Sequence, residues 1–140
     1  MRYLLDTNVV SEMRKIRPGR ANERVAEWAD SVLPSELYIS VITLQELEIG
    51  VLGIERRDPT AGGNLRNWLE TQVIPAFSGR TLAVDSSIAL HSAIFHVPDP
   101  RPIRDSLIGA TASVHGMTLV TRNTKDFEYL DSPVLNPWGE

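Results

Sequence analysis

Three carboxylates occupy places where a fold of alternating strands and helices would gather a ligand. Asp6 directly follows the apolar stretch 2–5, which is typical of a strand, and Asp105 lies in the first turn of a predicted helix. Glu46 lies in a third stretch, 44–52, that also has helical character. Because open α/β sheets bind ligands beyond the carboxyl ends of their strands, we expect Asp6 and Asp105 to face each other there.

Taken singly, each of these acids also has an ordinary structural interpretation. Asp6 would serve as a helix cap, and Asp105 would be favoured in a first helical turn by the helix dipole. Glu46 is the one charge on a helical face with positions 42, 49, 50 and 53, and such carboxylates are rarely buried without a partner. Glu48 points the other way and is expected to be solvated, and Asp85 has the character of a plain N-cap.

Taken together, the three acids favour a divalent cation. Carboxylates that are brought together repel one another and raise each other's pKa unless a cation holds them. The chain has no cysteine, and its histidines (His91, His96 and His115) fall on predicted helices and are expected to be surface or packing residues. Oxygen ligands alone suit Mg²⁺ or Mn²⁺. Such an ion can activate water against a phosphodiester.

The elements that must position these acids alternate along the chain without hairpin signals. Strands are expected at 2–5, 37–39, 81–84 and 117–120, with an edge strand within 134–138. Helices are expected at 8–15, capped by Thr7 or Asn8, at 23–31, capped by Asn22, and at 44–52, 65–73, 88–96 and 104–115. A flexible break is expected over 58–63, and Gly116 is expected as a left-handed cap. This order predicts a parallel sheet with helices on both faces.

Composition narrows the class of protein. A chain of 140 residues with 42% hydrophobic and 23% charged residues is typical of one globular domain. No apolar run approaches the roughly 20 residues that span a bilayer, and no signal-peptide pattern opens the chain. The expected location is therefore the cytoplasm, without membrane contact. The net charge of −4 disfavours binding of nucleic acid by the molecule as a whole. Basic residues are nevertheless concentrated in the segment 14–24, which is either an RNA-facing rim or a solvated loop.

Several motifs together resemble one known family. They are the stretches 4–12 (LLDTNVVSE), 40–47 (SVITLQEL), 104–112 (RDSLIGATA), 120–123 (VTRN) and 136–138 (NPW). The chain is similar to the PIN-domain ribonucleases, specifically the VapC-type toxins of bacterial toxin–antitoxin pairs, nearest the FitB-like branch. The resemblance implies a single PIN domain over residues 1–140, with a Rossmann-like three-layer α/β/α fold around a mainly parallel sheet.

The same resemblance implies an activity and assigns residues to it. It implies a Mg²⁺- or Mn²⁺-dependent endoribonuclease, in which Asp6, Glu46 and Asp105 are the catalytic, metal-binding acids. Water activated by the metal would attack the phosphodiester without a covalent enzyme intermediate. The neighbouring residues Thr7, Asn8 and Thr121 would orient the ligands or metal-bound waters.

One position departs from the family pattern. The fourth acidic position, just after the Thr-Arg pair, is Asn123 here. An amide oxygen can accept but carries no charge, so a second metal site would be weaker. Asp126 would substitute if the turn folds back, or it is simply a turn residue. One-ion and two-ion sites both remain open.

The resemblance also implies partners. They are an RNA substrate, a small cognate antitoxin that itself binds DNA, and a second copy of the chain in a homodimer. The antitoxin's C-terminal segment would insert an Arg or Lys among the acids. The apolar helices 23–32 and 44–54 are both candidate dimer faces, and the sequence does not choose between them.

Two other functions compete with a nuclease. The first is a catalytically silent PIN module that binds RNA or a partner, with Asn123 as its only support. The second is a haloacid-dehalogenase-like phosphohydrolase with Asp6 as nucleophile. That chemistry needs a second Asp two residues on, where this chain has Asn8.

Overall fold

Five parallel strands form the centre of the computed structural model, which describes all 140 residues. They lie in the order β3-β2-β1-β4-β5. The strands are β1 (Tyr3–Leu5), β2 (Leu37–Ser40), β3 (Thr81–Leu82), β4 (Thr118–Val120) and β5 (Val134–Leu135). Leu4 of β1 aligns with Tyr38 of β2 on one side and with Leu119 of β4 on the other. The parallel sheet and its C-terminal edge strand confirm the prediction.

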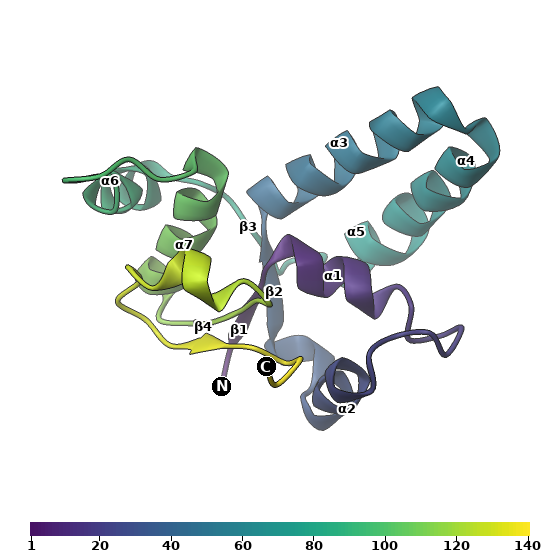
Figure 1. Cartoon of the computed structure of the whole chain (residues 1–140), viewed down its shortest axis with the longest axis horizontal. Helices are drawn as coiled ribbons and strands as arrows, with labels where there is room; N and C mark the ends of the chain where they lie inside the picture. Colours follow the sequence, from purple (N-terminus) through teal and green to yellow (C-terminus); the bar gives the residue numbers. More distant parts are fainter.

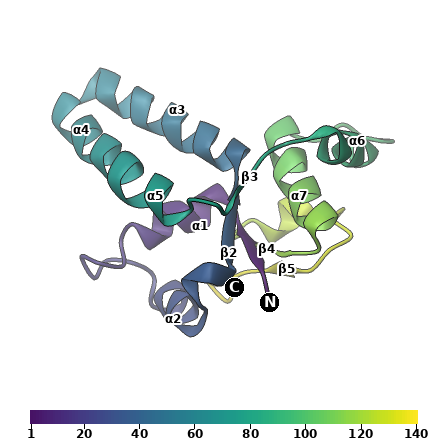
Figure 2. The same ribbon diagram turned by 180° about the vertical axis from the view of Figure 1, so that it is seen from behind.

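Helices cover both faces of this sheet (Figures 1 and 2). One side carries α1 (Thr7–Met13), α2 (Glu23–Ser31), α3 (Val41–Arg57), α4 (Pro59–Trp68), a π-helical turn (Leu69–Val73) and α5 (Ile74–Ala76). The other carries α7 (Ile103–His115), with α6 (Ser86–Ile94) packed outside it. Short 3₁₀ turns span Pro34–Glu36 and Thr124–Phe127. The arrangement is the predicted three-layer α/β/α fold.

The core has two halves because β1 is buried on both faces. Leu4 and Leu5 are both fully buried, yet they point to opposite sides, as successive residues of a strand must. Leu5 joins the cluster that contains Val9 of α1, whereas Leu4 packs with Ile108 of α7. Continuous apolar runs of this kind are typical of parallel strands covered on both faces.

The start of α1 corrects one expectation and connects the fold to the site. Neither Thr7 nor Asn8 caps this helix. Asp6 is the N-cap, and one of its oxygens accepts the Thr7 backbone N–H at 2.8 Å. The first acid is thus held at the junction of β1 and α1.

The predicted flexible break over 58–63 is wrong, because these residues begin a helix. Asp58 caps α4 by accepting the Ala61 N–H at 3.1 Å, and Pro59 occupies the first helical turn, where its missing N–H costs nothing. Gly62 allows α4 to approach α3 closely, since a Cβ there would lie 2.4 Å from the Glu55 Cα. Gly62 therefore serves helix packing, and α3 and α4 form an antiparallel arm that projects from the sheet (Figure 1).

The buried face of α3 also differs from the sequence interpretation. Thr43, Leu47 and Val51 are its buried residues, whereas Ile49 is 50% exposed. Glu48 is not simply solvated, because it pairs with Arg66 of α4. The apolar residues of α3 are distributed around the helix, so its sequence fits burial of more than one face. Contact with α4 and the sheet determines which residues are buried.

Other local predictions are confirmed. Asn22 accepts the Arg24 N–H at 3.0 Å and caps α2, and Asp85 accepts the Ile88 N–H at 3.0 Å and caps α6. Gly116 ends α7 in the left-handed conformation, with φ of 64°. No helix combines the length and apolar character that crossing a membrane requires.

Candidate active site at the carboxyl ends of the strands

Asp6 is the most firmly held of the three predicted acids. It is 6% exposed, and both of its carboxylate oxygens are hydrogen-bonded. Oδ1 accepts the Thr7 N–H at 2.8 Å, and Oδ2 accepts the Thr121 hydroxyl at 2.8 Å. The ends of β1 and β4 together therefore fix its position.

Glu46 reaches the same place from α3. The Thr7 hydroxyl donates to its Oε1 at 2.6 Å and lies 3.3 Å from the Thr43 hydroxyl. Its other oxygen, Oε2, lies 3.3 Å from Nε of Arg104. Thr7 thus connects two of the predicted acids, because its N–H binds Asp6 and its hydroxyl binds Glu46.

Asp105 approaches from the first turn of α7 and is half-buried. The negative charges of Glu46 and Asp126 both act on it. Asp126 is exposed and lies in the 3₁₀ turn Thr124–Phe127, which places its charge near Asp105. Asp126 lines a neighbouring hollow together with Asn123, whereas Asp105 lines the hollow that contains Glu46.

The electrostatics of these acids reflect burial and mutual repulsion. Burial, opposed by the bonds from Thr121 and Thr7 and reinforced by the charges of Asp105 and Glu46, raises the pKa of Asp6 to about 6. Burial also raises the pKa of Asp105, with Glu46 and Asp126 adding to the effect. A group of carboxylates in which the ionised form is disfavoured attracts a cation.

The remaining predicted residues play smaller parts in the geometry. Asn8 lies with its amide nitrogen 3.5 Å from the Thr121 hydroxyl oxygen, and its amide oxygen accepts the Arg122 N–H at 3.4 Å. Asn123 contributes its backbone N–H to the Thr121 hydroxyl oxygen at 3.0 Å, while its exposed side chain lines a polar hollow that includes Asp126. Thr121 is therefore the centre of this hydrogen-bonded group.

The donor set suits a hard divalent cation, although the acids do not enclose one as they lie. All the candidate donors are oxygens, which Mg²⁺ and Mn²⁺ prefer. No three acidic or histidine side chains stand close enough together to surround one ion. Each oxygen of Glu46 has a partner within the chain, Thr7 for Oε1 and Arg104 for Oε2.

Sequence reasoning missed two residues of this site. Arg104 contacts Glu46, and only its position beside Asp105 could have indicated this. Tyr129, which follows the 3₁₀ turn, has its pKa raised to about 12 by burial and by the charge of Asp105. No sequence pattern signals that tyrosine, because its approach depends on how the turn packs against α7.

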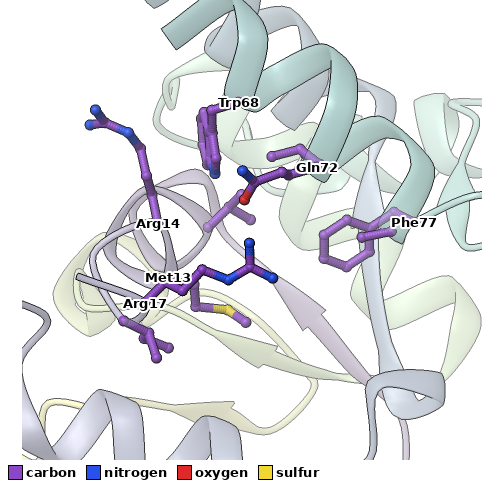
Figure 3. Close-up of a pocket in the computed structure, with 10 residues that line it drawn as sticks. Met13, Arg14, Arg17, Trp68, Gln72 and Phe77 are labelled. Atoms are coloured by element: carbon purple, nitrogen blue, oxygen red, sulfur yellow. The ribbon is translucent and has the colours of Figure 1, made fainter. Parts of the chain in front are cut away.

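A separate apolar groove lies between α1 and the α4–α5 segment (Figure 3). Met13, Trp68 and Phe77 line it, and Arg14 and Arg17 of the basic segment border it. The Arg14 guanidinium carbon lies 5.9 Å from the centre of the Trp68 ring. Arg14 and Arg17 are exposed and border this groove, which is lined by other residues than the acidic site.

Comparison with known proteins identifies the family. A profile of the PIN domain matches residues 3–132. The chain belongs to the PIN-domain family. Toxin FitB of Neisseria gonorrhoeae is 37% identical over 98% of this chain and 99% of its own length. The VapC ribonuclease Y4jK of Sinorhizobium fredii is 35% identical over 96% of both chains. The crystal structure of FitAcB from Neisseria gonorrhoeae superposes with a TM-score of 0.87 at 35% identity, covering 99% of both chains.

Proposed function

We propose that this PIN-domain protein is a divalent-metal-dependent endoribonuclease and the toxin of a toxin–antitoxin pair. The observation that carries the proposal is that Thr7 bonds both Asp6 and Glu46, while Glu46 and Asp105 line one hollow beside them. The similarity to a protein named a VapC ribonuclease, along essentially the whole chain, supports the substrate class.

In this proposal Asp6, Glu46 and Asp105 hold Mg²⁺ or Mn²⁺, and Asp126 provides a fourth carboxylate in place of the uncharged Asn123. A bound ion of this kind lowers the pKa of water and stabilises the charge of a phosphodiester in transit. The protein's own contribution is to hold Asp6 in one orientation and to place Glu46 beside it, which reduces the rearrangement needed when the ion binds.

Specific residues supply that positioning. Thr121 and the Thr7 N–H hold both oxygens of Asp6, so this carboxylate keeps one orientation. The Thr7 hydroxyl holds one oxygen of Glu46. Asn8 lies against Thr121 and the Arg122 N–H and supports the loop that carries them.

We further propose a cognate antitoxin as the partner. The support is the similarity to a protein named a toxin, FitB, and the resemblance to VapC-type toxins, which pair with an antitoxin. In this proposal the antitoxin, rather than this chain, is the component that binds DNA.

The decisive experiment is cleavage of a labelled RNA pool in Mn²⁺, Mg²⁺ or EDTA. We expect discrete products with either metal, none in EDTA, and a loss of about 100-fold or more in Asp6→Asn, because several kcal/mol of charge stabilisation depend on the ion. Asp85→Asn is the matched control, because Asp85 caps α6 and leaves the site unchanged. A folded wild type that binds RNA and never cuts it would favour the silent module.

A further inference from the structure

Arg104 is the cation that contacts the acidic site directly, and its contact is loose. Its side chain is 54% exposed, and its Nε lies 3.3 Å from Oε2 of Glu46. The guanidinium makes no other ion pair and no hydrogen bond within the chain. Most of its five N–H donors are therefore free.

Other arginines of this chain are bound far more completely. Arg66 donates to both oxygens of Glu48, at 2.5 and 2.8 Å, and also to Glu55 at 2.8 Å. Arg80 donates to three backbone carbonyls. These side chains connect elements of the fold through several bonds, whereas the Arg104 guanidinium makes the single contact with Glu46.

The surroundings of Arg104 fix its backbone and leave its side chain room to move. Glu46, Pro102, Ile103, Arg104 and Asp105 line one hollow, so the arginine stands in the same space as two of the acids. Pro102 precedes α7, and Arg104 lies in the first turn of this helix. A change of rotamer would carry the guanidinium away from Glu46 without disturbing the helix.

We propose that Arg104 exchanges partners during the proposed reaction. Arg104 would release the Glu46 carboxylate when a divalent cation binds there, and its guanidinium would then bind a phosphate of the nucleic acid beside the site. A cation repels the guanidinium and competes for Oε2, so the two occupy Glu46 in turn. The planar fork of arginine fits two phosphate oxygens at once. This inference rests on the proposed nuclease function for its second step.

The first step is tested by calorimetric titration of the whole chain with Mn²⁺ alone. Arg104→Gln is expected to bind Mn²⁺ about two- to fivefold more tightly than the wild type, the range that corresponds to losing one exposed ion pair. Arg56→Gln removes the same charge from the far end of α3, about 15 Å along the helix from Glu46, and is expected to match the wild type. Unchanged or weaker Mn²⁺ binding by Arg104→Gln would overturn the exchange.

The second step is tested by single-turnover cleavage of single-stranded RNA at saturating Mn²⁺, with the protein concentration for half-maximal rate measured at several salt concentrations. Arg104→Gln is expected to raise the protein concentration that gives the half-maximal rate. In a plot of the logarithm of this concentration against the logarithm of the salt concentration, the slope is expected to fall by about 0.7, as for one lost phosphate contact. Arg104→Lys keeps the charge and is expected to retain the slope, and Arg56→Gln is expected to retain both. An unchanged slope in Arg104→Gln would overturn this step.

The two proposals fail in different ways. Absence of cleavage by the wild type overturns the nuclease function, and with it the phosphate step. Cleavage by the wild type together with identical Mn²⁺ affinities in wild type and Arg104→Gln overturns the exchange alone.

Discussion

The acidic site and the α3–α4 arm treat their carboxylates in opposite ways. At the site, burial raises the pKa of Asp6 to about 6 and raises that of Asp105, so the fold disfavours the charges there. In the arm, hydrogen bonds from Arg66 lower the pKa of Glu48, so the fold favours that charge. Glu46 and Glu48 are two residues apart on the same helix and belong to the two different regions.

The difference between them lies in the partner that each acid meets. Glu48 has a two-pronged bond to Arg66, which also binds Glu55 and so connects α4 to α3. Glu46 meets a threonine hydroxyl and one nitrogen of a largely exposed arginine. Glu48 thus has both oxygens bound by one arginine, whereas Glu46 has a single arginine contact and remains open to a bound cation.

The largest effect on stability should come from Asp6 and depend on pH. Because its pKa is raised from 3.8 to about 6, the folded protein holds a proton that the unfolded chain releases between these values. The free energy of unfolding therefore decreases as pH rises through this range, by about 3 kcal/mol in total, since each unit is worth roughly 1.4 kcal/mol. Urea unfolding in EDTA from pH 4 to pH 7 measures this loss.

Asp6→Asn is the control for that measurement. Asparagine keeps the helix cap without a titrating group, so the variant is expected to lack this part of the pH dependence and to be the more stable protein at pH 7. If the free energy of unfolding changed with pH in the same way in the wild type and in Asp6→Asn, burial of the Asp6 carboxylate would not affect stability, and the prediction would be wrong.

A smaller effect is expected at the contact between the two helices of the arm. Gly62→Ala places a Cβ 2.4 Å from the Glu55 Cα, so a backbone must shift. We expect a loss of about 1–3 kcal/mol in the free energy of unfolding, as for other overpacked sites. Gly63→Ala meets nothing within 4 Å and should be neutral or stabilising by up to about 1 kcal/mol, as is usual in a helix. Equal effects at the two glycines would mean that α3 and α4 are not in close contact.

The smallest effect should come from the ion pair of the arm. Glu48→Gln removes a carboxylate that is 40% exposed, so the expected loss is about 0.5–1 kcal/mol, the range for pairs open to solvent. Because the pKa of Glu48 is lowered, this contribution is present at neutral pH and is lost as the pH falls below the usual glutamate range. Thermal unfolding at pH 7 and at pH 3 checks both statements, and a larger loss at pH 3 would contradict them.

Much of the fold could be predicted because local signals agree with the tertiary structure. Asn22, Asp85 and Gly116 form the caps that their residue types favour, and the apolar stretches around Leu4 and Leu119 form adjacent strands. Gly62 misled the prediction because its role is contact with a distant helix, which local propensity does not reveal. The face of α3 was misjudged for the same reason.

The candidate site could be predicted only as a set of acids. The sequence indicates Asp6, Glu46 and Asp105, and their mutual electrostatic influence agrees with that set. It could not indicate that Thr7 connects two of them or that Arg104 occupies Glu46, because these contacts join residues 39 and 58 positions apart. The position of Asp126 near Asp105 likewise depends on how a 3₁₀ turn packs, which composition alone does not determine.

The most direct test of the account compares Glu46→Gln with Glu48→Gln in Mn²⁺-dependent cleavage of labelled RNA. Both substitutions remove one charge from α3 without a change of size, two residues apart. We expect Glu46→Gln to lose cleavage by about 100-fold or more, because a ligand of the ion is removed, while Glu48→Gln cleaves like the wild type. Equal activity of the two variants, or cleavage that persists in EDTA, would contradict the claim that the carboxylates at the sheet edge form a metal-dependent active site.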